Sequence, residues 1–153
     1  MADQPLKQSL LTFFYASTLD ELRMMNEKRL PGSITYNSLL YLHLVEYNQG
    51  CTPSYLSRLL GVSKPAVTAK LNELAARGLL LRQKNPQDGR ETILKLSEEG
   101  AALYAAYDRT MYRAMAHLEK HFSGQDLALF CRMLDEASKV YLKGGKSDGG
   151  SFD

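Results

Sequence analysis

The chain has 153 residues, of which 44% are hydrophobic and 24% charged, and its net charge is +2. That is enough chain for one domain with a substantial core, in proportions ordinary for a globular protein. The longest apolar runs fall far short of the about 20 residues that cross a bilayer, and the N-terminal residues lack the basic and apolar regions of a signal peptide. We therefore expect a cytoplasmic protein with no membrane partner.

Two helices are predicted in the first 50 residues. The first extends from about residue 6 to residue 29 and ends at Leu30-Pro31-Gly32-Ser33, because proline and glycine are costly inside a helix. The second begins near Thr35, a residue suited to the N-cap, and continues to Asn48-Gln49-Gly50. One face of the first helix, defined by helical spacing, consists of Leu6, Leu10, Phe13, Phe14 and Ser17, and Leu22 and Met25 extend its apolar surface.

A helix-turn-helix follows. Thr52-Pro53 combines an N-cap oxygen with a proline at the first helical position, where its missing N–H costs nothing. The short helix after it ends at Gly61, which readily adopts the left-handed conformation, and Val62-Ser63 completes the turn and caps the next helix. Two short helices joined in this way are typical of a helix-turn-helix. The residues expected to be buried from the short helix are Leu56, Leu59 and Leu60.

The second helix of this motif, residues 64–76, has an inward and an outward face. Val67, Leu71 and Leu74 share a narrow stripe that is expected in the core. The opposite face is small and polar, so it can approach the edges of DNA bases closely. Asn72 has the donor and acceptor that bind adenine bidentately, although it is equally an ordinary surface asparagine. The candidate DNA contacts of this helix and its cap are Ser63, Lys64, Pro65, Thr68, Ala69 and Asn72.

A β-hairpin is predicted directly after this helix. Residues 79–84 and 91–96 alternate in places between apolar and polar side chains, and the turn-rich segment 85–90 between them contains Asp-Gly. We interpret the hairpin as a wing that inserts Arg90 into the minor groove, with Asp88 orienting it and shared with Arg82. The alternative is a turn stabilised by Asp88 with Arg90 solvated. The candidate DNA contacts of the wing are Arg82, Lys84, Asp88 and Arg90.

Positive charge is concentrated in this part of the chain. Residues 58–95 contain eight basic and three acidic side chains, a net charge of +5, so the remainder carries −3. Such segregation suits a polyanionic partner, and on charge alone it equally suits a solvated basic face. Lys70, on the flank of its helix, is expected either to contact a phosphate or to be solvated.

Two further helices are predicted before the C-terminus. Ser97 caps a long helix that is expected to continue to about His121, and Ser123-Gly124-Gln125-Asp126 begins the last one. Residues after 143 are rich in glycine and are expected to form a disordered tail. The last helix repeats apolar residues at a spacing that suits packing against another helix, namely Leu127, Phe130, Leu134, Ala137 and Tyr141.

Several segments are weak signals singly but specific in combination, namely Ser63-Lys64-Pro65-Ala66-Val67-Thr68, Leu74, Gly78-Leu79-Leu80-Leu81-Arg82, Asp88-Gly89-Arg90 and Leu96-Ser97-Glu98-Glu99-Gly100. Together they resemble the MarR family of bacterial transcriptional regulators. The order of helices from about residue 6 to residue 143 matches as well. Gly89 departs from the pattern, because the family often has a basic residue there that contacts phosphate. Ser97 replaces a common threonine, an exchange between two good N-cap residues.

The resemblance implies a mainly α protein with a small β-hairpin wing. Residues 1–34 and 101–143 would form the dimerisation region of an obligate homodimer, residues 35–100 the winged helix-turn-helix that binds DNA, and residues 144–153 a tail. Each subunit would place its recognition helix in the major groove and its wing in the minor groove of double-stranded DNA. The two-fold axis implies a pseudo-palindromic operator with half-sites about 10 base pairs apart. Many members are repressors that release DNA when a small aromatic or phenolic effector binds.

A pocket for such an effector is one interpretation of an aromatic set near the junction of the two parts. Aromatic residues at helical spacing are also ordinary core residues, and that alternative stays open. The residues are Tyr36, His43, Tyr47, Tyr104 and Tyr107.

No catalytic, cofactor or metal site is predicted. His117 and His121 lack a third ligand nearby, so we interpret them as surface residues. Cys51 precedes a helix N-terminus, which can lower the pKa of a thiol, but neither it nor Cys131 lies in the first helix, where peroxide-sensing relatives carry their cysteine. No phosphate-binding loop or clustered nucleophile is present. The rival to a DNA-binding regulator is a winged helix used for protein–protein assembly.

Overall fold

The computed structural model describes residues 5–26, 34–86 and 88–143. The described residues are mainly helical with one antiparallel hairpin, as predicted, whereas the expected break at residues 30–33 and the tail at 144–153 lie outside them. The elements are α1 (Pro5–Asn26), α2 (Tyr36–Tyr47), α3 (Pro53–Leu60), α4 (Lys64–Ala76), β1 (Leu80–Lys84), β2 (Thr92–Leu96), α5 (Glu98–Tyr107), α6 (Arg109–His121) and α7 (Gly124–Lys143).

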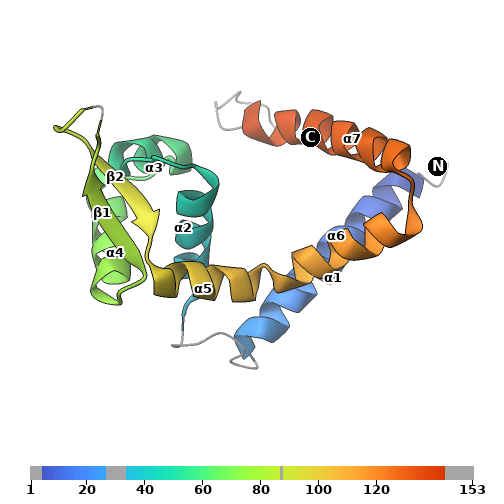
Figure 1. Ribbon diagram of the computed structural model, residues 1–153, viewed down its shortest axis with the longest axis horizontal. Helices are drawn as coiled ribbons and strands as arrows, with labels where there is room; N and C mark the ends of the chain where they lie inside the picture. The colour runs from blue at the N-terminus through green and yellow to red at the C-terminus, as the bar shows by residue number, and fades with distance from the viewer. Residues whose placement is uncertain (1–4, 27–33, 87, 144–153) are drawn as a thin grey trace, which may run out of the picture.

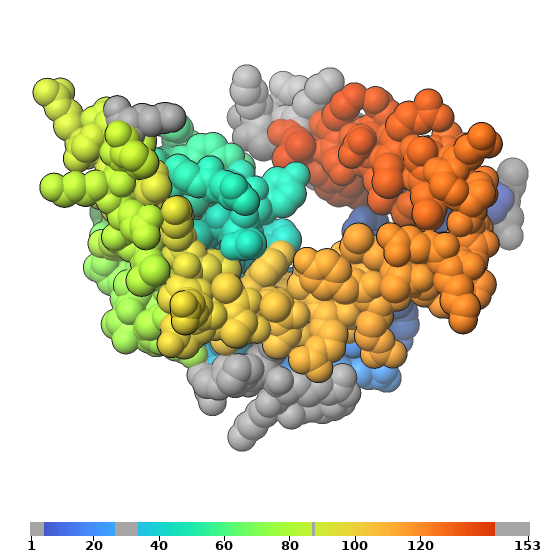
Figure 2. Space-filling view, viewed as in Figure 1, coloured from blue at the N-terminus to red at the C-terminus, as the bar shows by residue number. Residues whose placement is uncertain are grey.

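These elements form two parts, which Figure 1 shows side by side. The winged lobe consists of α2, α3, α4, β1 and β2, and the helical arm consists of α1, α6 and α7, with α5 leading from one to the other. In the space-filling view a hollow opens between the winged lobe and α7 (Figure 2). Among the described residues, no helix is both long and apolar enough to span a membrane.

The core lies in the winged lobe, where α2, α3, α4 and the hairpin meet. Its fully buried side chains include Leu42, Leu56, Leu71 and Leu94. The hairpin pairs Leu80 with Leu96 at its base. Burying leucines of this size contributes about 1.5–3 kcal/mol each, so this set is the main source of the lobe's stability.

Hydrogen bonds at the helix ends explain why the helices begin where they do. Gly61 ends α3 in the left-handed conformation with φ +64°, which a residue with a Cβ rarely adopts. The predicted caps are confirmed: the main-chain N–H groups of Ser38, Tyr55, Ala66 and Gly100 donate to the side chains of Thr35, Thr52, Ser63 and Ser97, respectively.

Two predictions about these elements are wrong. Leu56 is buried, but Leu59 and Leu60 are 45% and 37% exposed, because they occupy the last turn of α3 at the edge of the lobe. The long helix expected between residues 97 and 121 is two helices, broken at Asp108. Asp108 has ψ near zero, and its amide donates to Tyr104 while its carbonyl accepts from Tyr112. The backbone therefore bends there without a proline or glycine that could have predicted it.

The helical arm leaves most of its apolar side chains uncovered. Met24 alone is buried on α1, and α6 buries none of its residues. Tyr141 on α7 is 74% exposed although its spacing suits a helix–helix contact. The large exposed apolar residues of α1 and α7 include Leu6, Leu11, Phe13, Phe14, Leu22, Phe130, Met133 and Leu134.

Candidate nucleic-acid interface

Helix α4 is anchored by one face and exposes the other. Val67, Leu71 and Leu74 have no measurable exposure and face the core, as predicted. No other part of the described chain covers the opposite face, whose residues are Pro65, Thr68, Ala69 and Asn72. Ser63 and Lys64 at the N-terminal end of the helix are exposed as well.

A polar contact holds α4 against α2. Lys70 Nζ lies 2.8 Å from Glu73 Oε2, and the buried Ser38 hydroxyl donates to Glu73 Oε1 at 3.4 Å. The hydrogen bond from Lys70 lowers the pKa of Glu73 below its ordinary value, and the bond from Ser38 acts in the same direction. In the structure Lys70 is thus paired with Glu73, and its predicted contact with a phosphate stays a prediction.

The wing tip is closed by hydrogen bonds within the turn. Asp88 Oδ1 accepts from the main-chain N–H of Arg90 at 2.9 Å, and the Glu91 carbonyl accepts from the amide of Asn85 at 2.9 Å. Arg90 is exposed, and the turn between β1 and β2 projects from the winged lobe (Figure 1). Among the described residues, neither Arg90 nor Arg82 forms an ion pair with Asp88. Asp88 thus stabilises the backbone of the turn. The sequence had instead favoured contacts between Asp88 and the guanidinium groups of Arg90 and Arg82.

Arg82 contacts α4 instead. Its Nη2 donates to Asn72 Oδ1 at 2.8 Å and joins β1 to the outward face of α4. Both side chains belong to exposed residues. The two candidate contact sets, on α4 and on the wing, are thereby brought together on one surface. No signal at their spacing of ten residues could have predicted this bond.

Four of the five aromatic residues proposed to line a pocket contact one another, namely His43, Tyr47, Tyr104 and Tyr107. His43 Nδ1 and the Tyr104 hydroxyl are 2.8 Å apart, and the His43 ring stacks on Tyr47. The Tyr104 and Tyr107 rings also meet, with centroids 6.2 Å apart. Tyr36 makes no ring contact with these four residues among those described, but a carboxylate on α1 links it to Tyr107.

That carboxylate is Glu21, which the sequence did not single out. Its two oxygens accept from the Tyr36 hydroxyl at 3.0 Å and from the Tyr107 hydroxyl at 2.7 Å. Burial raises the pKa of both tyrosines, and the adjacent carboxylate raises it further, so both hydroxyls keep their protons. Glu21 is one of several polar residues on an amphipathic helix, and nothing in the sequence sets it apart from the others.

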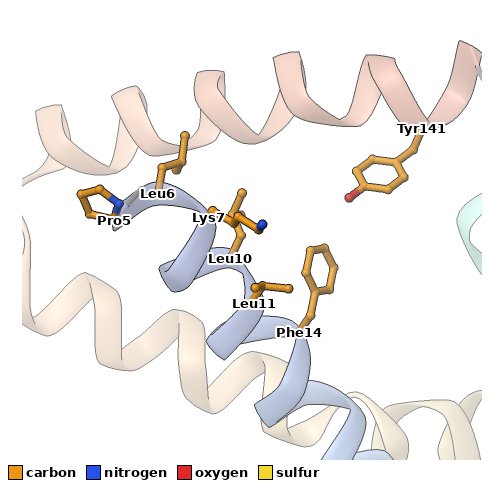
Figure 3. Close-up of a pocket in the computed structure, with 7 residues that line it drawn as sticks. All are labelled: Pro5, Leu6, Lys7, Leu10, Leu11, Phe14 and Tyr141. Atoms are coloured by element: carbon orange, nitrogen blue, oxygen red, sulfur yellow. The ribbon is translucent and has the colours of Figure 1, made fainter. Parts of the chain in front are cut away.

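A cavity of about 830 Å³ lies elsewhere, between the N-terminal half of α1 and α7 (Figure 3). It is open to solvent and mostly apolar. Its lining residues are Pro5, Leu6, Lys7, Leu10, Leu11, Phe14 and Tyr141.

The remaining reactive side chains form no site. Cys51 is buried, and this burial raises the pKa of its thiol, although the residue precedes a helix N-terminus. His117 and His121 are exposed, as predicted, and the His121 ring bonds the His117 carbonyl. Within the described ranges no three histidine, cysteine, aspartate or glutamate side chains are grouped to hold a metal ion.

Comparison with known proteins agrees with this architecture. Residues 33–91 match the model of the MarR family. The chain is 33% identical over 81 residues to the multiple antibiotic resistance protein MarR of Escherichia coli, covering 53% of this chain and 56% of that protein. The chain thus spans just over half the length of this relative.

Solved structures extend the similarity over most of the chain. Apo wild-type MarR from E. coli is 25% identical with a TM-score of 0.52, covering 84% of this chain and 96% of that one. FabT of Streptococcus pneumoniae in complex with DNA has a TM-score of 0.65 at 21% identity, covering 91% and 97%. The chain therefore has the winged helix-turn-helix fold of these structures, and its residues 33–91 match the MarR family model.

Proposed function

We propose that this protein is a regulator of transcription that binds double-stranded DNA as a homodimer on a pseudo-palindromic operator. One observation carries the proposal: the outward face of α4 is uncovered and is joined to the wing through Arg82 and Asn72. Recognition helix and wing therefore form one continuous surface, in the segment that carries a net charge of +5. FabT of Streptococcus pneumoniae, which has a similar fold, was solved in complex with DNA, and this supports the same assignment.

On duplex DNA, α4 would enter the major groove with Ser63, Lys64 and Thr68 nearest to the bases. Its small outward side chains permit that approach. The wing would follow the backbone to the minor groove, where Arg90 meets the enhanced negative potential and Lys84 contacts a phosphate. Asp88, bonded to the main chain of Arg90, holds the turn from which that arginine projects.

The helical arm would supply the dimer interface. Its apolar side chains on α1 and α7 are exposed, and the cavity between Leu10 and Tyr141 is open and apolar. A second copy that inserted its own arm would bury both, and apolar burial is the main driving force of association. Two winged lobes related by the two-fold axis would then meet two half-sites.

In the cytoplasm, the protein would repress transcription until a small aromatic or phenolic effector binds to it. The aromatic set of His43, Tyr47, Tyr104 and Tyr107, with Tyr36 beyond Glu21, lies where α1, α2 and α5 meet. A ligand that displaced one of these contacts would change how the helical arm is positioned against the winged lobe. Repression and release of DNA by an effector are inferred from the resemblance to the MarR family.

A salt titration tests the proposal. Affinity for duplex DNA should fall steeply with salt, because each phosphate contact releases counterions. Arg90→Ala should lower the affinity about tenfold and reduce the salt slope by about one, with the dimer and the helix content unchanged. Arg132→Ala, the same loss of charge on α7, is the matched control. Binding by Arg90→Ala equal to wild type would refute the wing assignment, and a flat salt response would favour protein–protein assembly.

A further inference from the structure

The Asn72 amide is oriented by its neighbour before any DNA is present. Arg82 Nη2 donates to Asn72 Oδ1 at 2.8 Å. A guanidinium group only donates hydrogen bonds, so the amide atom that faces it must be the oxygen. The amide Nδ2 is therefore turned away from Arg82, and no residue of the described chain accepts a hydrogen bond from it.

This orientation changes what Asn72 can read. Bidentate recognition of adenine needs the asparagine oxygen to accept from the N6 amino group while its amide donates to N7. The oxygen of Asn72 already accepts from the cationic Arg82. The N6 amino group of an adenine placed there would therefore lie beside another hydrogen-bond donor. Guanine instead presents two acceptors, N7 and O6, in the major groove.

We propose that Asn72 and Arg82 form a single reading unit that offers donors and selects guanine over adenine at the base pair it faces. Arg82 is thus a specificity-determining residue that also acts through Asn72, and the inference rests on the proposed DNA-binding function. The unit replaces the adenine contact that Asn72 alone suggested in the sequence.

The surroundings of the pair fit this role. Both residues are exposed on the uncovered surface, and among the described residues no carboxylate pairs with Arg82. Glu73, which directly follows Asn72 in the sequence, is engaged by Lys70 and Ser38. The remaining N–H donors of the guanidinium group are therefore not committed to a carboxylate that DNA would have to displace.

Selection from randomised duplexes, followed by titration of single base-pair variants, tests the proposal. Asn72→Ala identifies the position that Asn72 reads, because base preference should be lost there. At that position the wild type should prefer guanine to adenine. In Arg82→Met the amide oxygen is released, and the guanine-to-adenine affinity ratio should fall by at least about tenfold, within the range of one bidentate contact. Thermal melting of each variant checks that the fold is kept.

Lys84→Met is the matched control. Lys84 lies two residues after Arg82 on the same face of β1, and both substitutions remove one positive charge. This control should weaken binding to all sequences equally and leave base preference unchanged. If the wild type prefers adenine, if Arg82→Met keeps the wild-type ratio, or if Asn72→Ala changes no position, the reading unit is overturned while DNA binding stands. If the wild type binds no duplex, the proposed function fails instead.

Discussion

Glu21 joins three helices, so its hydrogen bonds should contribute measurably to the docking of the arm on the winged lobe. The carboxylate on α1 accepts from Tyr107 on α5 at 2.7 Å and from Tyr36 on α2 at 3.0 Å. A hydrogen bond to a charged group is worth about 1.5–3 kcal/mol, and less where water competes. Tyr107 is half-buried whereas Tyr36 is 46% exposed. We therefore expect a coupling of about 1.5 kcal/mol for Glu21 with Tyr107 and below about 1 kcal/mol with Tyr36.

Double-mutant cycles measure these couplings directly. The free energy of unfolding is obtained in urea for Glu21→Met, Tyr107→Phe, Tyr36→Phe and the two double variants. Protein concentration is held constant, because association contributes to the stability of a dimer. Glu119→Met is the control, since Glu119 is exposed on α6 and has no hydrogen bond or ion pair among the described residues. It should change stability by no more than about 0.5 kcal/mol.

The relative size of the two couplings decides the interpretation. A Glu21–Tyr107 coupling below about 0.3 kcal/mol, the limit of ordinary additivity, would refute a direct energetic link. A larger coupling with Tyr36 than with Tyr107 would contradict the reasoning from burial and distance. Loss of DNA affinity in Glu21→Met with the dimer intact would extend the role of Glu21 from stability to the placement of the winged lobes.

Three further predictions follow from particular residues. Gly100→Ala should destabilise the protein by about 1–3 kcal/mol in thermal unfolding, because its Cβ would overlap the main chain before β1; Gly124→Ala, with open space around it, should not. Lys70 lowers the folded pKa of Glu73, so stability present above the unfolded pKa of about 4.3 is lost as pH falls through the folded pKa. Glu73→Gln should therefore lose less stability than wild type between about pH 6 and about pH 3.5 in urea unfolding; an equal loss would exclude this linkage. Gly89→Lys, at an open site on the wing, should tighten DNA binding and steepen the salt slope by about one; an unchanged slope would place the tip away from phosphate.

The helix-turn-helix was predictable because its signals are local. Thr52, Gly61 and Ser63 satisfy main-chain groups within three residues of themselves, so their chemistry sets the helix ends wherever the segment lies. The buried stripe of α4 follows from helical spacing alone, which is why Val67 and Leu71 are placed as expected.

Other features depend on which elements meet in space. The bend at Asp108 occurs where no helix-breaking residue stands, so only the packing of α5 and α6 reveals it. The contacts of Glu21 with Tyr107 and of Arg82 with Asn72 join residues 86 and 10 positions apart. Short-range hydrogen bonds and periodicity determined the elements of this protein, whereas the partners of its polar side chains were decided by tertiary packing, because side chains far apart in sequence select one another only after the helices have docked.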